Sequence, residues 1–344
     1  MSSIIQKKIS KVNSSIKEIK EEYDMKKKKN IEVSFKFPQD HQQHRIISKC
    51  AREIFATVYK HKHIEDKYKK ELSFYTCKSK FCPLCNYNKS RKWSSAIFKR
   101  VTELQEKEEQ RFIFLTLTVK NCKIGELDPT IKNMNRAWLV FWKKHLSKQF
   151  NGFVKILELT FPNGKDAHPH FHVLLSTNKN YFYKSNKKYL TTQKISEVWG
   201  RLLKVDYKPI VDIRIIKPKM IKGEWVSKEA IPAVVAEMTK YPMKDTDYRK
   251  LSEETMVILY EQLYRKRLIA TGGNLKINIS KIEKSDVEDM DEDEVTVWEK
   301  LAYLVLRYMQ NGYVLTQGDY YLLDTKPKKD LNEDIEGIPF IPRE

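Results

Sequence analysis

The sequence His168-Pro-His-Phe-His-Val-Leu-Leu175 is typical of a strand that carries polar side chains on one face. In a strand, residues i and i+2 point to the same side of the sheet, so His170 and His172 project together and Phe171 faces the opposite side. Paired imidazoles suit a divalent metal, because histidine is the commonest metal ligand in proteins. The alternative is a buried strand whose histidines are only hydrogen-bonded. The features described below favour the metal site.

The preceding segment supplies a third candidate ligand. Residues 153–161 have the apolar pattern of a strand, and Pro162-Asn-Gly164 is a turn signal. A hairpin folded about this turn places Glu158 opposite the two histidines, within reach of both imidazoles. Two histidines and one carboxylate leave coordination positions open to a substrate, as a catalytic metal site requires. We expect His168 to lie outside the strand proper, and we keep it as an alternative third ligand.

A second candidate metal site is formed by cysteines. Three of the five cysteines lie within nine residues of one another: Cys77, Cys82 and Cys85. The Cys82-x2-Cys85 spacing is that of a zinc knuckle, and a structural zinc needs four ligands. Cys50 is the natural fourth ligand, and His61 or His63 is the alternative. Such a closed site has a structural role, because it leaves no position open for chemistry.

Composition indicates a folded protein with a polyanionic partner. The chain has 344 residues, of which 41% are apolar, so it has enough apolar side chains for a core. Lys and Arg outnumber Asp and Glu by 65 to 45, which gives a net charge of +20 and favours nucleic acid. No apolar run has the length of a membrane span and no signal peptide is evident, so we expect a cytoplasmic protein whose cysteines are thiols or metal ligands.

Several further segments have clear helical or strand patterns. Residues 5–23 repeat apolar side chains at steps of three and four, which predicts an amphipathic helix lying on the protein's own body rather than a coiled coil. Lys26 to Lys29 then form a basic linker. Residues 112–119 predict a central strand. Trp138 and Phe141 recur at helical spacing, so we assign them to the core rather than to base stacking.

The helix expected after Trp225 carries the other candidate catalytic residues. Its core face comprises Ile231, Val234, Val235 and Met238. At the margin of that face, Glu237 and Tyr241 are four residues apart and therefore one helical turn from each other. They form either an interfacial hydrogen-bonding pair or, beside a metal site, a nucleophile and a water-activating base. Pro242 directly follows Tyr241, which predicts that the helix ends or kinks there.

Together these motifs resemble the replication initiators (Rep proteins) of rolling-circle plasmids, within the His-hydrophobic-His (HUH) endonuclease superfamily. The resemblance spans residues 45–276. The motifs that carry it, in chain order, are Cys77-x4-Cys82-Pro-x-Cys85 with the upstream Cys50, Phe114-Leu-Thr-Leu-Thr118, Glu158-x-Thr160, His168-Pro-His-Phe-His172-Val-Leu, Glu237-x2-Lys240-Tyr241-x2-Lys244 and Arg267-Leu-Ile-Ala-x-Gly-Gly273.

The resemblance implies a role for each matching residue. His170 and His172, with Glu158, would hold Mn²⁺ or Mg²⁺ against the scissile phosphate. Tyr241 would attack the phosphorus and form a 5′-phosphotyrosine link. Glu237 stands where two-tyrosine phage initiators have a second tyrosine, and it would activate water to end the cycle by hydrolysis. The resemblance also implies that Lys244 neutralises phosphate charge.

We therefore expect an α+β protein with a mostly antiparallel HUH-type central sheet, flanking helices and an N-terminal zinc-binding subdomain. The expected activity is nicking and joining of single-stranded DNA at a plasmid origin, with Zn²⁺ at the cysteines. No Gly-x4-Gly-Lys-Ser/Thr motif is present, so we expect a host helicase as partner, and the oligomeric state stays open. The expected divisions are residues 1–30 (amphipathic helix and basic linker), 31–105 (zinc-binding subdomain), 106–276 (nicking-joining domain), 277–295 (acidic linker) and 296–344 (aromatic-rich segment).

Four other functions remain open at this point. An HUH transposase or a mobilisation relaxase would use the same chemistry. A non-enzymatic, zinc-stabilised nucleic-acid-binding protein would explain the charge and the cysteines, but it would leave His170, His172 and Tyr241 without a purpose. A metal-dependent hydrolase without a covalent step would use water instead of Tyr241. The sequence also leaves open whether residues 296–344 pack on the protein or serve as a contact surface.

Overall fold

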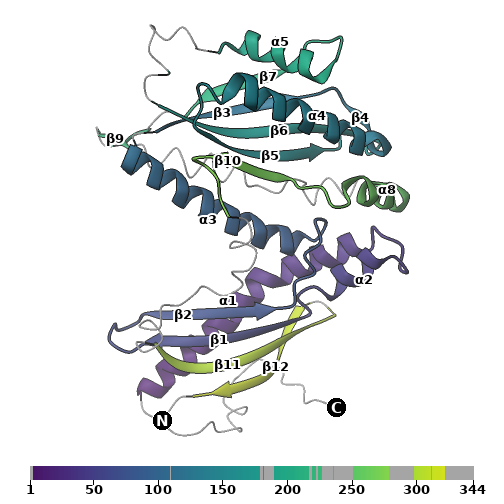
Figure 1. The fold of residues 1–344 in the computed structure, drawn as a ribbon. Coiled ribbons are helices and arrows are strands. Elements are labelled where there is room, and N and C mark those ends of the chain that lie inside the picture. Colours follow the sequence, from purple (N-terminus) through teal and green to yellow (C-terminus); the bar gives the residue numbers. More distant parts are fainter. Residues whose placement is uncertain are drawn as a thin grey trace. The chain divides into compact units, whose positions relative to one another are not determined.

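The computed structural model describes residues 3–108, 110–178, 181, 190–216, 219–221, 224–226, 235, 251–278, 298–310 and 312–321. The chain forms two compact units, one from residues 1–86 and 284–344 and the other from residues 87–283 (Figure 1). Every strand pairing among the described residues is antiparallel. The prediction of an α+β protein with antiparallel sheets is confirmed.

In the first unit, helix α1 (Ser3–Ser34) packs on a sheet with the strand order β12-β11-β1-β2. The α1 side chains from Val12 to Tyr23 that form the predicted apolar seam are buried, so this helix lies on the protein's own body as expected. The other elements of this unit are α2 (Gln42–Lys49), β1 (Glu53–His61), β2 (Tyr68–Phe74), β11 (Trp298–Met309) and β12 (Gly312–Tyr320).

The linker expected at Lys26 to Lys29 is not present, because α1 continues through these residues to Ser34. The physical reason lies at Lys27, which is buried. Its ammonium donates hydrogen bonds to the carbonyl oxygens of Ser48, at 2.7 Å, and Cys50, at 2.6 Å. These partners lie more than 20 residues later in the chain. The basic run from Lys26 to Lys29 therefore includes a buried contact, although its sequence alone suggests that it is solvated.

The aromatic-rich C-terminal segment packs on the first unit. Strand β11 pairs with β1 along its length, and β12 continues the sheet beyond β11. Tyr313 is fully buried and its hydroxyl donates to the carbonyl oxygen of Ala51. The question that the sequence left open is therefore answered for Trp298–Met309 and Gly312–Tyr320, which complete a sheet begun near residue 53.

The second unit is built on a sheet with the strand order β10-β5-β6-β3-β7, and β4 also pairs with β6. The strands predicted at residues 112–119 and 153–161 are present as β3 and β5. The strands of this sheet are β3 (Arg111–Thr118), β4 (Cys122–Lys123), β5 (Gly152–Thr160), β6 (Asp166–Thr177), β7 (Val211–Ile215) and β10 (Ile269–Gly273). A separate short pair is formed by β8 (Lys219–Ile221) and β9 (Glu224–Val226).

Helices cover both faces of this sheet. On one face, Trp138 of α4 (Leu127–Phe141) and Trp199 of α5 (Thr192–Leu203) both pack on Phe171 of β6. Trp138 and Phe141 are buried, so their assignment to the core is confirmed. The remaining helical segments of this unit are α3 (Pro83–Glu108, which begins in the first unit), the 3₁₀ turn η1 (Ile124–Glu126), the π-helical turn η2 (Trp142–Leu146) and α8 (Glu253–Leu263).

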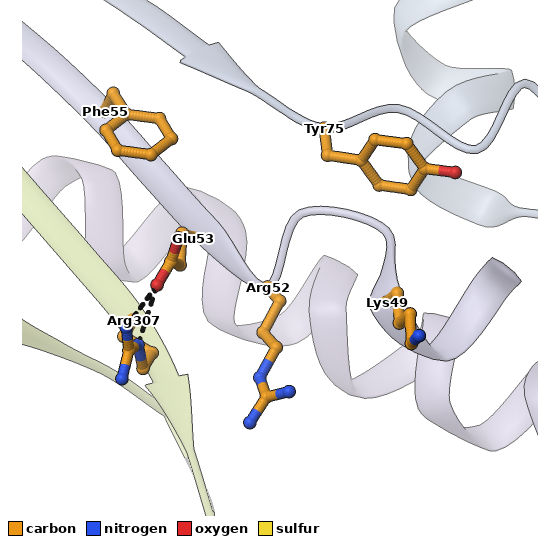
Figure 2. Close-up of a pocket in the computed structure, with 6 residues that line it drawn as sticks. All are labelled: Lys49, Arg52, Glu53, Phe55, Tyr75 and Arg307. Atoms are coloured by element: carbon orange, nitrogen blue, oxygen red, sulfur yellow. Dashed lines mark hydrogen bonds and ion pairs between the residues drawn. The ribbon is translucent and has the colours of Figure 1, made fainter. Parts of the chain in front are cut away.

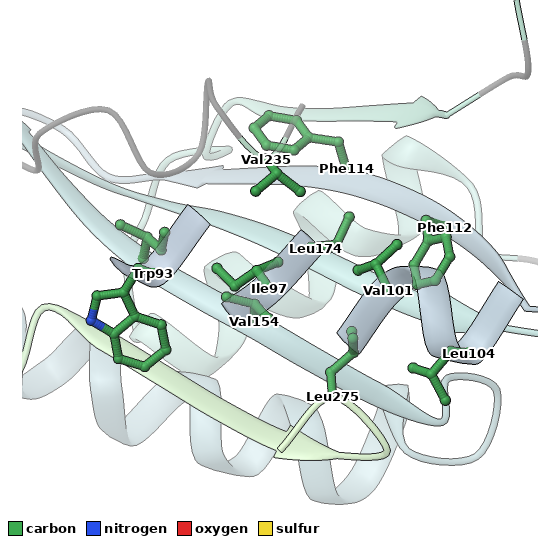
Figure 3. Close-up of a cluster of buried hydrophobic side chains, with 11 residues drawn as sticks. Trp93, Ile97, Val101, Leu104, Phe112, Phe114, Val154, Leu174, Val235 and Leu275 are labelled. Atoms are coloured by element: carbon green, nitrogen blue, oxygen red, sulfur yellow. The ribbon is translucent and has the colours of Figure 1, made fainter. Parts of the chain in front are cut away.

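Helix α3 covers the opposite face through a cluster of buried side chains (Figure 3). Its members are Trp93, Ile97, Val101 and Leu104 from α3, Phe112 and Phe114 from β3, Val154 and Ile156 from β5, Leu174 from β6, and Val235 and Leu275. We call this the α3 cluster. Among the described residues, no helix combines the length and apolar character needed to cross a membrane.

Candidate active site and metal centres

Strands β5 and β6 bring the first candidate site together. Glu158 pairs with His170 across the hairpin, as the predicted register requires. The carboxylate oxygen Oε2 of Glu158 lies 3.4 Å from Nε2 of His170 and 2.7 Å from Nε2 of His172. At the turn, the side-chain oxygen of Asn163 accepts hydrogen bonds from the backbone N–H groups of Lys165 and Asp166, which fixes the hairpin.

Each of the two imidazoles has a contact at its Nδ1 atom that orients the ring. Nδ1 of His172 lies 3.2 Å from Oγ1 of Thr116 on the neighbouring β3, and its ring stacks on Phe114 with the centroids 5.2 Å apart. Nδ1 of His170 contacts the carbonyl oxygen of His168 at 3.3 Å. Because both Nδ1 atoms have partners, both Nε2 atoms are left to converge on Glu158. This is the arrangement by which supporting hydrogen bonds orient metal-binding histidines.

The carboxylate of Glu158 is ionised in this environment. Burial by itself would raise the pKa of Glu158, but hydrogen bonds from His170 and His172 outweigh it and hold the pKa well below its usual range. The side chains of all three residues are about one-fifth exposed or less. A charged, largely buried carboxylate beside two imidazoles is stable when a cation shares the site.

The donor atoms of these three residues fit a divalent metal. The carboxylate oxygen and the two imidazole nitrogens lie within 4.8 Å of one another. All three come from neighbouring positions of one sheet face, so a cation bound among them keeps its remaining coordination positions free. The predicted set of Glu158, His170 and His172 is therefore assembled in space.

His168 is placed differently from expectation. It lies within β6, which begins at Asp166, because the strand is extended by pairing with Thr160 on one side and by the β4 pairing at Ala167 on the other. Its Nδ1 lies 2.8 Å from the side-chain oxygen of Asn121. His168 is not part of the group whose donor atoms converge, so Glu158 is the third candidate ligand that the geometry favours.

Glu237, Tyr241 and Lys244 lie outside the described residues, so their roles stay predictions. Of the predicted core face of their helix, Val235 is described, and it is buried in the α3 cluster (Figure 3). Since side chains alternate along strands, this cluster shares its sheet face with the metal residues: Phe114 with Thr116, Ile156 with Glu158. Val235 is thus buried on the metal-bearing face, and in the sequence it precedes Glu237 by two residues.

The four cysteines converge in the first unit. The sulfurs of Cys50, Cys77, Cys82 and Cys85 lie within 4.8 Å of one another. A tetrahedral zinc with Zn–S bonds of about 2.3 Å separates its sulfurs by roughly 3.8 Å. Sγ of Cys85 lies 3.5 Å from that of Cys50 and 3.6 Å from that of Cys77. The donor set therefore fits a structural zinc with Cys50 as the fourth ligand.

The surroundings of this cysteine cluster support that assignment. Hydrogen bonds from Cys77, Cys82 and Cys85 lower the pKa of the Cys50 thiol, which favours a thiolate within the cluster. His61, the alternative ligand, instead lies at the end of β1, where it contacts His63 and Trp298. The buried ammonium of Lys27 on the Cys50 carbonyl places a positive charge beside the sulfurs.

Two supporting residues were not singled out by sequence reasoning. Thr116 orients His172, and Asn121 contacts His168. Thr116 belongs to the motif Phe114-Leu-Thr-Leu-Thr118, but its function depends on the pairing of Thr116 with His172, which joins strands 56 residues apart. The alternation of threonines in that strand was the available signal, because it places both hydroxyls on one face.

Comparison with known proteins agrees with the geometry. A family model described as a replication protein matches residues 68–313. "Protein rep" of Streptococcus pneumoniae serotype 2 (strain D39 / NCTC 7466) is 33% identical over 256 residues, which cover 71% of this chain and 77% of that protein. "Protein rep" of Bacillus amyloliquefaciens is 34% identical over 255 residues, covering 69% and 74%.

A "Replication protein" of Staphylococcus aureus is 34% identical over 204 residues, which cover 56% of this chain and 84% of that protein. No solved structure matches the chain. The family match covers more than two thirds of the sequence and includes both strands that carry Glu158, His170 and His172. The chain therefore belongs to this replication protein family, the Rep initiators of rolling-circle plasmids.

Proposed function

We propose that this initiator is an HUH endonuclease that nicks and rejoins one DNA strand at a plasmid origin, through a 5′-phosphotyrosine intermediate. The observation that carries the proposal is the convergence of Glu158 Oε2 with the Nε2 atoms of His170 and His172 on one sheet face. Origin nicking needs a bound cation and a nucleophile at the same phosphate. The burial of Val235 on that face supports the placement of the nucleophile's segment there.

In the proposed reaction, Glu158, His170 and His172 would hold Mn²⁺ or Mg²⁺, and a cation bound there would supply Lewis-acid polarisation of the scissile phosphate. The phenol oxygen of Tyr241 attacks the phosphorus and loses its proton. The bond from phosphorus to the 3′ oxygen breaks, and that oxygen takes up a proton. The products are a 5′-phosphotyrosine and a free 3′-hydroxyl that primes synthesis, and the covalent bond conserves the energy needed for rejoining.

Glu237 has the terminating role in this scheme. Its carboxylate takes a proton from a water molecule that attacks the scissile phosphate of the origin regenerated by synthesis. The bond from that phosphorus to its 3′ oxygen breaks and the oxygen takes up a proton, so the cycle ends by hydrolysis instead of by a second covalent link. Lys244 neutralises phosphate charge. Zn²⁺ held by the four cysteines would have a structural role and take no part in the chemistry.

The partner is the plasmid's origin DNA, bound as duplex and cut as a single strand. The net charge of +20 supports duplex binding, whose affinity should fall steeply with salt. Strand separation ahead of synthesis would be supplied by a host helicase. The replication names of the relatives favour this function over an HUH transposase or a mobilisation relaxase.

The test is an adduct assay. The protein is incubated with Mn²⁺ and single-stranded oligonucleotides tiled across the origin of its own replicon, and protein–DNA adducts are resolved on a denaturing gel. Wild type should form an adduct, and Tyr241→Phe should not. Tyr264→Phe is the matched control, because this tyrosine is 55% exposed in the same unit and should keep the adduct. Glu237→Ala should form the adduct but lose hydrolysis.

Other outcomes identify the rival functions. Cleavage without an adduct, unchanged in Tyr241→Phe, would mean that water is the nucleophile and would sink the covalent mechanism. Absence of cleavage on a confirmed bound origin would favour a non-enzymatic DNA-binding protein. An adduct that also appears in Glu158→Gln at the same rate would contradict the assigned metal ligands.

A further inference from the structure

The first unit contains a pocket that is distant in sequence from the proposed catalytic residues. It has a volume of about 530 Å³, which lies within the roughly 300–1,000 Å³ range of small-ligand sites. The residues that line it are Lys49, Arg52, Glu53, Phe55, Tyr75 and Arg307 (Figure 2). We call it the Arg52 pocket. Three cations, one carboxylate and two aromatic rings meet there.

Two of the cations are available to a ligand. The guanidinium of Arg307 is held by Glu53, with Nε 2.8 Å from the carboxylate (Figure 2). Within the part of the chain that the structure describes, the ammonium of Lys49 and the guanidinium of Arg52 form no hydrogen bond or ion pair. Both residues are exposed. Two exposed cations beside an already neutralised pair leave the pocket with an excess of positive charge, which suits an anionic ligand.

The aromatic rings give the pocket a second kind of contact. Tyr75 is 59% exposed, although a tyrosine ring of this size is normally packed away, and Phe55 is half-buried on β1. Phe55 lies on the sheet face opposite to Ile54 and Ala56, which are buried on the side that α1 covers. Tyr59 shares the face of Phe55 by strand alternation, as Tyr303 does through its pairing with Thr57. Aromatic rings therefore continue from the pocket along this face.

Three of the pocket residues lie close in sequence to members of the cysteine cluster. Lys49 and Arg52 flank Cys50, and Tyr75 precedes Cys77 by two residues. The backbone N–H of Ala51 donates to the carbonyl oxygen of Tyr75, which ties these two segments together. The backbone segments that carry Lys49, Arg52 and Tyr75 are therefore held together, which reduces the conformational entropy lost on binding.

We propose that the Arg52 pocket binds one nucleotide of single-stranded DNA, with the phosphate between Lys49 and Arg52 and the base stacked against Tyr75 and Phe55. This goes beyond the proposed nicking function, which requires a strand only at the metal site of the other unit. The pocket gives the chain a second, sequence-independent contact with the strand that the reaction produces or consumes.

The chemistry favours a single strand over a duplex. Cations alone would suit the backbone of either form, but a base reaches an aromatic ring in a pocket only when it is unstacked. Base stacking on exposed aromatic rings together with cations along the backbone is the general mode of binding single strands without sequence preference. A duplex would contact Lys49 and Arg52, but none of its bases would stack on Tyr75.

The test measures binding without cleavage. Every variant is made in the full chain that also carries Tyr241→Phe, and no divalent cation is added, so failure of the nicking proposal cannot mimic failure of this one. Fluorescence anisotropy of a labelled oligothymidylate is followed as a function of salt, beside a labelled duplex. The pocket variants are Tyr75→Ala, Tyr75→Trp and the double variant Lys49→Ala with Arg52→Ala. The controls in the same unit are Lys62→Ala and Phe35→Ala, both at exposed positions.

The pocket variants should fail in different ways. Tyr75→Ala should weaken single-strand binding by about 5- to 150-fold without changing the salt dependence, and Tyr75→Trp should restore it. The double variant should lower the slope of log affinity against log salt by about 0.7, the value for one lost phosphate contact on a single strand. Duplex binding should be unchanged by Tyr75→Ala.

Two results would overturn the proposal. If the pocket variants bind the oligothymidylate like Lys62→Ala and Phe35→Ala, the pocket does not contact single-stranded DNA. If the double variant weakens duplex and single strand equally while Tyr75→Ala has no effect, the cations contact a duplex backbone and no base enters the pocket. Thermal unfolding of each variant distinguishes lost binding from lost folding.

Discussion

The carboxylate of Glu158 lies closer to His172 than to His170, although His170 is its direct partner in the strand pairing. The Oε2–Nε2 distances are 2.7 Å to His172 and 3.4 Å to His170. The diagonal contact is made because His172 is held from its other side by Thr116, whose strand β3 lies beyond β6. Three strands, and not the hairpin alone, therefore set the positions of the donor atoms.

The first prediction concerns the support for His172. Thr116→Val removes the hydroxyl that lies 3.2 Å from Nδ1 of His172 and leaves the side-chain shape nearly unchanged. Loss of such a supporting hydrogen bond typically weakens metal binding by about 10- to 100-fold, because the imidazole is no longer held in one orientation. Titration with Mn²⁺, followed by electron paramagnetic resonance, measures the affinity.

The control is Thr116→Ser, which keeps the hydroxyl and should bind Mn²⁺ like the wild type. Equal Mn²⁺ affinity in Thr116→Val and the wild type would mean that β3 has no part in orienting the ligand.

The second prediction concerns the cysteine cluster. Cys82→Ser removes one buried sulfur of the four, and zinc binding couples directly to folding in such sites. The purified variant should carry less zinc than the wild type and unfold at a lower temperature. Elemental analysis and thermal melting measure the two effects.

Cys122→Ser is the matched control, since Cys122 is half-buried and lies outside the cluster. It should retain the zinc content and the melting temperature of the wild type. Full zinc content in Cys82→Ser would instead show that the other residues bind the metal without it.

The third prediction concerns a buried lysine of strand β5, on the sheet face opposite to the candidate metal ligands. Lys155 is 6% exposed, its ammonium lies 3.8 Å from the centroid of the Phe171 ring, and its hydrogen-bond partner is the side chain of Asn135. Burial lowers the pKa of Lys155 to about 7. Between about pH 7 and the ordinary lysine value near 10.5, the unfolded chain binds a proton that the folded chain does not, so this residue makes stability rise with pH across that window.

Lys155→Met should remove that dependence. Denaturation by urea at about pH 8 and about pH 9 should give a smaller gain in stability for the variant, the difference approaching about 1.4 kcal/mol per pH unit. Lys148→Met serves as the control, because Lys148 is exposed and should leave the dependence unchanged. Parallel pH curves for wild type and Lys155→Met would mean that the ammonium keeps an ordinary pKa when folded.

The parts of the fold that follow from local pattern were predictable. The register of β5 and β6 follows from strand alternation and from the Asn163-Gly164 turn, because a shift by one residue would move Glu158 to the other face. The cysteine site was predictable because Cys77, Cys82 and Cys85 lie close together in the sequence, Cys50 lies upstream of them, and a structural zinc requires four ligands.

The parts of the fold that depend on contacts between segments distant in the sequence were not predictable. Strand β11 pairs with β1 although Arg307 and its partner Glu53 are 254 residues apart, and no local feature of Trp298–Met309 specifies that partner. The burial of Lys27 depends likewise on carbonyl groups of another segment. The Thr116 contact with His172 needs the order of three strands, which the sequence of any one strand does not contain.

The last prediction concerns the segment that carries Tyr241, and it rests on the proposed nicking function. Val235 and Val101 are the same residue type in the same α3 cluster, and both are buried, but Val101 belongs to α3 and Val235 precedes Glu237 by two residues. Truncation of either valine to alanine removes comparable packing and should lower stability by about 1–3 kcal/mol. Because a small displacement of a reacting group reduces the rate strongly, Val235→Ala should slow adduct formation about 10-fold or more beyond the effect of Val101→Ala. Single-turnover adduct formation, measured well below both melting temperatures and at saturating Mn²⁺, compares the two variants directly.

Equal rates would show that Val235 stabilises the core without positioning the nucleophile, whereas a slow Val235→Ala with unchanged Mn²⁺ affinity would place its effect on Tyr241 and not on the metal ligands.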